Sequence, residues 1–399
     1  MRHAGSFVVT MMLAALPLYA CAGGEAIESD AGPTPNDGGA QVMTGAQVRG
    51  NVRDAFVAEA QWMRTYGLAA LANGPDAQPA FDRLNQSESE IVRQVVPFAG
   101  DAKAAELGQL LHARANAFAD LVASLNSQSA STSSDPQAAL DANAQQIADF
   151  FAALCPNAFP GNSGAYLEQA NRSMIAGLQE HAAKDDAQSV IDFDAAQVSS
   201  VQFADRVGVA LSSTFNAELA PSTTSRIEDA LTLDFHKQLG DQAFWMRAYV
   251  VDHMNDQATQ PELDRSVKAS TDMGSVLESY FGEDVGGQME AYIHADTTDA
   301  IAFVIALDLG QGTIDAISSK WNADANTFAL YLASNAGVDQ ASAQRLLSTI
   351  VDRERAMILA RASKQWDAEA ADYQMALDSR NAFGDLFASS VIAKFPAVH

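Results

Sequence analysis

The chain of 399 residues is 48% hydrophobic, and its 50 acidic side chains outnumber 24 Lys and Arg, which gives a formal charge of −26. A surface so acidic repels phosphate backbones and offers no basic patch, which excludes nucleic acid and anionic lipid from the partners we expect.

The first twenty residues are typical of an export signal peptide. Arg2 precedes an apolar run at residues 7–18, which is too short for a membrane span of about 20 residues. The sequence LYAC at residues 18–21 then resembles the lipobox of bacterial lipoproteins, with Cys21 as the lipidated residue. Tyr19 is larger than is usual in that motif. The alternative is an ordinary secretory signal that is cleaved nearby.

Residues 21–43 are predicted to form a flexible tether, because they are rich in Gly, Pro and acidic residues and have little to bury. A lipid on Cys21, a tether and folded domains together predict an exported protein anchored in the cell envelope. Ala22 follows the cysteine in place of aspartate. By resemblance to Gram-negative sorting rules, this favours the outer membrane, with the protein facing the periplasm or the surface.

The second half of the chain repeats the first at a nearly constant offset. The matching pairs are Trp-Met-Arg at 62–64 and 245–247, Gln-Pro-x-x-Asp-Arg at 78–83 and 260–265, and His112 and His294. Such a repeat is too long for a solenoid unit of roughly 20–50 residues. It indicates two copies of one domain, at residues 44–220 and 221–399.

From about Thr44 onwards the pattern is helical, with abundant alanine and apolar residues at helical spacing. Gly, Pro and polar residues predict the breaks, which lie at residues 73–76, 100–101, 127–136, 155–164, 183–187, 256–261, 282–287, 310–319, 336–340 and 363–367. Each half then holds about six helical segments. The sequence therefore predicts an all-α fold of two tandem antiparallel helical bundles, each similar to a four-helix bundle.

One motif resembles a nucleotide site without supporting one. The sequence DLGQGT at residues 308–313 resembles the phosphate loop of the actin and hexokinase superfamily. The corresponding stretch of the first half, residues 116–128, is a plain helix ending, and a lone Gly-rich match is weak. We interpret Gly310 as the end of a helix.

The recurring histidines are the candidates for a binding site. His112 and His294 each follow an apolar helical stretch, so we expect both to face a bundle interior. Glu290 precedes His294 by one turn, a spacing that could hold a metal, and Glu59 is a further acid of this candidate set. The alternative is a polar core in which each histidine is hydrogen-bonded to a carboxylate or carbonyl.

The repeated Trp-Met-Arg cluster and Cys155 are interpreted as parts of the scaffold. Aromatic and Met side chains at helical spacing indicate core packing, with the Arg reaching an acid across the bundle. Cys155 has Leu154 and Pro156 as neighbours and no nearby His, so we expect a buried, unreactive thiol.

The chain resembles an uncharacterised bacterial family of His-containing helical bundles. In the second half the shared features are Trp245 and Arg247, Phe281-Gly282, His294, Trp321 with Asp324, and Phe395-Pro396. In the first half they are Trp62, Arg64, His112 and Asn143, with Leu140 in place of the later Trp. The family's further His, which precedes the first Trp by one helical turn, is replaced here by Glu59 and Gln242, and no late His occurs around Ile350. If the family's histidines bind a metal, the resemblance implies that this chain has lost most of that set.

These features predict an exported, lipid-anchored helical protein that acts by binding or as a structural component of the envelope. The alternative is a metal- or cofactor-binding bundle that uses His112, His294, Glu59 and Glu290. No catalytic residue and no resident cofactor are assigned, since no nucleophile stands beside a base in a known motif and no zinc signature occurs. The membrane, through the lipid on Cys21, and a protein or small molecule are the expected partners.

The lipidation of Cys21 is directly testable. Cys21→Ala should release the protein from membranes or block its processing, because no other cysteine ends the export signal. Membrane fractionation, with and without the signal-peptidase inhibitor globomycin, measures this. Unchanged fractionation under both treatments would contradict lipidation.

Overall fold

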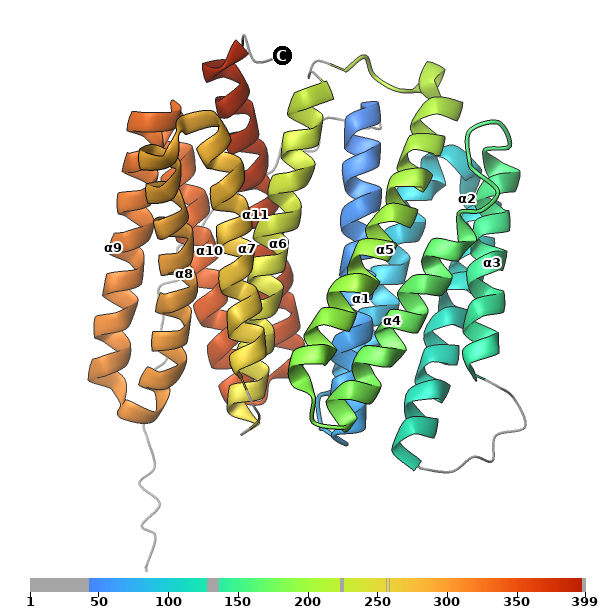
Figure 1. Cartoon of the computed structure of the whole chain (residues 1–399), viewed down its shortest axis with the longest axis horizontal. Coiled ribbons are helices and arrows are strands. Elements are labelled where there is room, and N and C mark those ends of the chain that lie inside the picture. Colours follow the sequence, from blue (N-terminus) through green and yellow to red (C-terminus); the bar gives the residue numbers. More distant parts are fainter. Residues whose placement is uncertain (1–42, 128–135, 223–225, 256, 258, 397–399) are drawn as a thin grey trace, which may run out of the picture. The chain divides into compact units, whose positions relative to one another are not determined.

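The computed structural model describes residues 43–127, 136–222, 226–255, 257 and 259–396. Helices make up nearly all of these residues, which confirms the predicted all-α class (Figure 1). The α-helices are α1 (Gly45–Leu71), α2 (Ala77–Ser127), α3 (Pro136–Leu154), α4 (Gly164–Ala182), α5 (Asp186–Thr214), α6 (Arg226–Met254), α7 (Gln260–Phe281), α8 (Glu283–Leu309), α9 (Gln311–Ala336), α10 (Gln340–Ala362) and α11 (Trp366–Lys394), with a short 3-10 helix at Asn216–Glu218. None of the described helices is both long enough and apolar enough to cross a membrane.

Capping side chains and glycines lie at several of the helix ends. Thr44 caps α1 in a capping box with Gln47, and Asp339 caps α10 by accepting a hydrogen bond from the backbone N–H of Ser342. The predicted loop at residues 310–319 is wrong, because only Gly310, at φ 99°, interrupts the helices. The residues after it stay helical since Ile314 and Ile317 pack against the core. The phosphate-loop resemblance is thus a helix end, as expected.

The backbone departs from the helical conformation at corresponding places in the two halves. Gly100 kinks α2 at φ 72° and ψ 164°, and its counterpart Gly282 separates α7 from α8 at φ 79° and ψ 164°. Positive φ is costly for residues with a Cβ, which explains glycine at both places. Lys184 and Lys364, which also occupy corresponding positions, have positive φ as well. The two halves therefore share an order of elements, while their origin by duplication stays a prediction.

Three hydrophobic clusters form the core. One contains only residues of the first half, such as Phe56 and Phe203, and one only residues of the second half, such as Phe235 and Phe387. The third draws on both halves and includes both tryptophans of the repeated motif. Residues 42–399 form one compact unit. The boundary at 220 and 221 stays a prediction, and a shared core joins the two sides of it.

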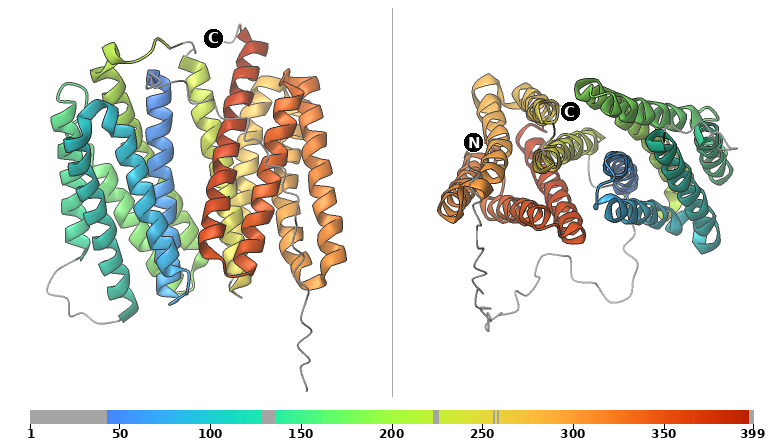
Figure 2. Two further views of the ribbon diagram at one scale, coloured as in Figure 1. Left: turned by 180° about the vertical axis from the view of Figure 1, so that it is seen from behind. Right: turned by 90° about the horizontal axis from the view of Figure 1, so that it is seen from below.

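The shared cluster is centred on α1 and α6, which lie next to each other when the helices are viewed end on (Figure 2). Each repeated arginine crosses to the other half. The Arg64 guanidinium lies 4.8 Å from the ring centroid of Trp245, and that of Arg247 lies 4.6 Å from the ring centroid of Trp62. Both distances are within the range of cation–π attraction. The Trp-Met-Arg repeat therefore belongs to the contact between the halves.

The aromatic contacts of the two tryptophans cross between the halves in the same way, but only one of the two arginines finds its acid in the other half. Trp62 packs edge-on against Tyr373, and Trp245 packs edge-on against Phe193, the counterpart of Tyr373 in the first half. Arg64 pairs with Glu262 at 3.2 Å across the halves, whereas Arg247 holds Glu369 of its own half with two hydrogen bonds. The expectation that each arginine reaches an acid is confirmed.

The arginines of the second repeated motif also cross between the halves. Arg83 of α2 donates to the side chain of Gln374 on α11, and Arg265 of α7 donates to Asp194 on α5 at 2.5 Å. Arg265 also pairs with Asp241 within its own half, at 3.0 Å. The two crossing bonds fix the register of α2 against α11 and of α7 against α5.

Removing one partner of a buried ion pair should be far costlier than removing one partner of an exposed pair. Arg247→Met removes the guanidinium that donates two hydrogen bonds to Glu369, whose side chain is 4% exposed, and leaves it the more distant Arg361, at 3.9 Å. This should lower the free energy of unfolding by about 3 kcal/mol, the lower end of the range for a broken buried pair. Arg247→Met with Glu369→Leu should restore much of that loss. Urea unfolding measures both. The control is Lys268→Met, which breaks the exposed pair with Asp272 and should cost under about 1 kcal/mol. Equal losses in Arg247→Met and Lys268→Met would refute the prediction.

Candidate functional site

The two recurring histidines do not face a bundle interior, so that expectation is wrong. The side chain of His112 is 58% exposed, with Nδ1 3.1 Å from Oδ1 of Asn85, and His294 is exposed. Their neighbours Leu111 and Ile293 take the buried positions. Because successive helical residues point roughly 100° apart, each histidine is turned out to the surface.

The other candidate residues are not gathered around these histidines. Glu290 is half-buried and accepts a hydrogen bond from Thr271 at 2.9 Å. Across the described residues, no three His, Cys, Asp or Glu side chains come together in a way that could hold a metal ion. Cys155 is buried as expected, and burial raises the pKa of its thiol. Cys21 lies outside the described residues.

Glu59, the remaining candidate, belongs to a buried polar cluster in the first half. Its carboxylate lies 2.5 Å from Nη1 of Arg114, whose Nη2 donates to Oδ1 of Asn171 at 2.9 Å. Burial, aided by the charge of Glu59, raises the pKa of the adjacent Glu88 to about 8, although Arg114 opposes the shift. Within the part of the chain that the structure describes, Glu59 therefore belongs to a buried polar cluster and not to a metal site.

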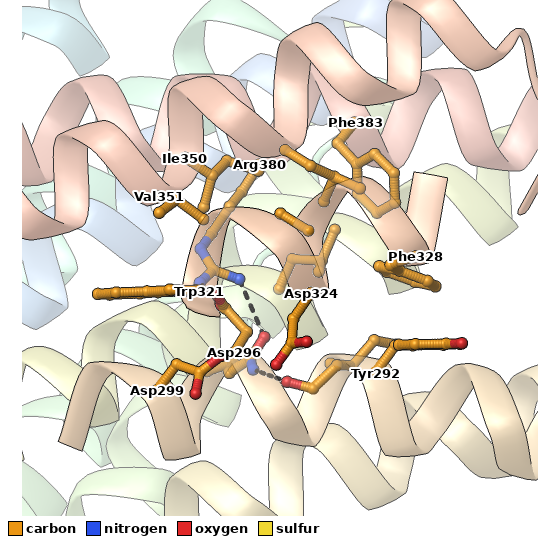
Figure 3. Close-up of a pocket in the computed structure, with 15 residues that line it drawn as sticks. Tyr292, Asp296, Asp299, Trp321, Asp324, Phe328, Ile350, Val351, Arg380 and Phe383 are labelled. Carbon is orange, nitrogen blue, oxygen red and sulfur yellow. Dashed lines mark hydrogen bonds and ion pairs between the residues drawn. The ribbon is translucent and has the colours of Figure 1, made fainter. Parts of the chain in front are cut away.

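A second polar cluster surrounds Arg380 in the other half (Figure 3). Arg380 donates to Gln242, at the position matching Glu59, and to Asp296, at the position matching Arg114, over 2.9 and 2.6 Å. It also donates to Glu354 through Nε at 2.9 Å. Burial raises the pKa of Glu354 to about 8, although Arg380 opposes the shift. The two halves thus place their buried arginine on different helices.

The Arg380 cluster borders a small cavity with one polar and one aromatic wall. Figure 3 shows Asp296 and Asp299 on the side opposite Phe328 and Phe383. The cavity volume is about 40 Å³, which holds only a few water molecules. Oδ2 of Asp299 is buried and accepts no hydrogen bond from any described residue. This cavity is too small for an ordinary organic ligand.

A hollow of about 480 Å³ lies where the C-terminal ends of α1 and α6 meet the turn between α10 and α11, at one end of the helices (Figure 1). We call it the end hollow. Its walls include Arg64, Ala69 and Asp76 of α1 and the following turn, Phe244, Arg247 and Asp252 of α6, and Arg361, Lys364 and Trp366. A second hollow of about 620 Å³ adjoins it and shares Arg361, Lys364 and Trp366. Both halves of the chain therefore build one site of small-molecule size.

Buried arginines line the end hollow. Arg64, Arg247 and Arg361 are each 3–4% exposed. Arg361 pairs with Asp76 at 2.7 Å, and its guanidinium lies 4.7 Å from the ring centroid of Trp366. The half-buried Trp366 adds aromatic surface to the site.

The charged groups of the hollow differ in their surroundings. Burial and the charge of Glu262 raise the pKa of Asp252 well above its usual value, although Arg64 opposes the shift. Lys364, by contrast, is exposed and forms no ion pair with any described residue. The hollow thus combines buried, paired arginines with one exposed lysine.

Sequence reasoning did not identify this site. Its residues come from three segments near positions 64–76, 244–257 and 361–366, and no spacing rule joins them. The repeated Arg64 and Arg247 were a partial signal, which was interpreted as scaffold alone. The lysines at 184 and 364 also recur, but only the structure places Lys364 in the lining of the same hollow as Arg64 and Arg247.

The comparisons with known proteins add no identification. No family model matches the chain, and neither a curated protein nor a solved structure matches it. The resemblance to the His-containing bundle family stays a prediction.

The raised pKa of Glu88 predicts a specific dependence of stability on pH. A carboxyl with a pKa near 8 when folded and 4.5 when unfolded contributes stability below pH 4.5 that is lost as pH rises to about 8. Glu88→Gln keeps the neutral form, so its unfolding free energy should fall less steeply over this range, by up to about 1.4 kcal/mol per pH unit. Urea unfolding at pH 5, 6.5 and 8 measures the slope. The exposed Glu106→Gln on the same helix should keep the parent slope; an unchanged slope in Glu88→Gln would contradict the shift.

Proposed function

We propose that this protein is exported, is anchored in the cell envelope by a lipid on Cys21, and acts there by binding a small organic molecule in the end hollow. The size of the hollow, together with a lining from both halves that includes buried arginines and aromatic side chains, carries the proposal. Small-molecule sites usually occupy about 300–1,000 Å³ and favour interfaces between structural units. The end hollow, at about 480 Å³, fits that range, whereas the cavity at Arg380, at about 40 Å³, does not.

The lining of the hollow also favours binding over a purely structural role. An empty hollow lowers stability because the atoms that line it lose packing contacts. Burying charged side chains also lowers stability unless they are well paired. A wall that combines Phe244, Trp366 and several buried arginines provides both apolar surface and a few directed polar groups. This combination is typical of ligand sites.

A neutral aromatic probe tests whether the end hollow binds small molecules. Benzyl alcohol should bind the full chain with an affinity on the order of millimolar, given its few heavy atoms, which saturation-transfer NMR detects. Ala69→Trp places a large ring in the wall of the hollow and should abolish the signal, because Ala69 lines it.

Ala102→Trp is the matched control, since Ala102 is an exposed residue of α2 away from the hollow. It should leave the signal unchanged. The proposal would be refuted by absence of any signal with the parent protein, or by equal signals from Ala69→Trp and the parent.

A further inference from the structure

We infer that His236 is a proton-dependent clamp between the two halves of the chain. As an imidazolium cation it joins Asp54 of the first half to Asp385 of the second, and loss of one proton releases the halves at the N-terminal parts of α1 and α6. The inference does not depend on the proposed function. It is carried by the placement of the two carboxylates and by the separate hydrophobic clusters of the halves at this level.

Both ring nitrogens of His236 face a carboxylate. Nδ1 lies 3.1 Å from Oδ2 of Asp54 on α1, and Nε2 lies 3.0 Å from Oδ1 of Asp385 on α11. An ionised carboxylate only accepts hydrogen bonds, and a neutral imidazole has only one N–H to donate. Both contacts are therefore hydrogen bonds only when the ring carries two protons. After loss of one proton, one of the carboxylates faces a nitrogen lone pair and no longer binds the ring.

The surrounding packing holds the ring between these two acids. Gly384 of α11 lies against the imidazole, since a Cβ at this position would come within 3.0 Å of Cδ2 of His236. Asn381 donates to Oδ2 of Asp54 at 3.2 Å, which keeps this carboxylate directed towards α11. The side chain of His236 is 10% exposed, so water can still reach the ring and exchange its protons.

The clamp lies where each half has a hydrophobic cluster of its own. Phe56 of α1 belongs to the cluster of the first half, and Phe235 of α6 to that of the second. The cluster that draws on both halves begins further along the two helices, at Ala60 and Ala243. Loss of the clamp can therefore open this end of the contact while the shared cluster stays intact near the end hollow.

The charges around His236 set the direction of its pH dependence. Burial alone would lower the pKa of the imidazole, but the hydrogen bonds and charges of Asp385 and Asp54 outweigh burial and raise this pKa from 6.5 to about 10. The clamp therefore contributes fully below pH 6.5 and is lost as the pH rises to about 10. Other charged groups on the same helix or in the lining of the adjacent hollow of about 530 Å³ are Asp234 and Lys237 of α6, Glu90 and Arg93 of α2, and Asp378 of α11.

Nitrogen NMR and amide hydrogen exchange of the full chain test the clamp. At pH 8, both ring nitrogens of His236 should be protonated in ¹⁵N-histidine spectra. Between pH 7 and 10, exchange at residues 45–56 and 226–239, corrected for the intrinsic effect of pH, should rise at least about tenfold as this end opens. In His236→Gln, which has no titrating ring, exchange there should already be fast at pH 7 and show no such rise.

His181→Gln is the matched control. Nδ1 of His181 lies 2.7 Å from Asp186, but both residues belong to the first half. This variant should keep the rise of the parent protein. A neutral His236 at pH 8, or a rise that persists in His236→Gln, would overturn the inference, as would equal effects of the two substitutions. The nitrogen spectrum is recorded on the parent protein, so it decides the question even if His236→Gln fails to fold.

Discussion

The exchange of two arginines between the halves is the contact on which the rest of the structure depends. Arg64 lies over Trp245 and Arg247 over Trp62, so each half provides the cation for the other half's indole. A buried guanidinium must be paired to be tolerated, and Glu262 and Glu369 supply that pairing. Arg64 takes its acid, Glu262, from the other half, whereas Arg247 takes Glu369 from its own. The contact therefore favours one register of α1 against α6, because a shift of one turn would separate Arg64 from Glu262 and both arginines from the indole rings over which they lie.

That register also shapes the end hollow. Because Arg64 and Arg247 lie near the C-terminal ends of their helices, fixing them brings the ends of α1 and α6 to the same level. The turn after α10 then closes the hollow with Arg361 and Trp366. The same side chains hold the halves together and line the site. Substitutions there will change stability and binding at once, and only exposed residues such as Lys364 can separate the two effects.

Structural features that depend on local chemistry can be predicted from the sequence, whereas features that depend on tertiary contacts cannot. Periodicity, capping residues and glycine gave the helices and most of their ends, because these are set within a few residues. The break at 310–319 failed since the core contacts of Ile314 override a Gly-rich start. The apolar neighbours of His112 and His294 predict an interior position for both histidines. A step of one residue along a helix, however, turns a side chain from the buried face to the exposed face. Glu59 lies in a buried polar cluster, but its partner Arg114 is on another helix, far along the chain, and could not be identified by spacing.

A comparison of corresponding positions also shows where the side chains of the two halves differ. The kinks at Gly100 and Gly282 and the lysines at 184 and 364 keep one backbone plan. The polar clusters do not keep one set of residues, since Arg114 is matched by Asp296 and the second arginine comes from α11 instead. Likewise Arg361 and Trp366 have His181 and Asp186 as counterparts. The two halves thus share a backbone arrangement but differ in side chains, and the end hollow contains Arg361 and Trp366, which have no like residues at the corresponding positions of the first half. Any ligand-binding role therefore belongs to one site of the whole chain and not to each half separately.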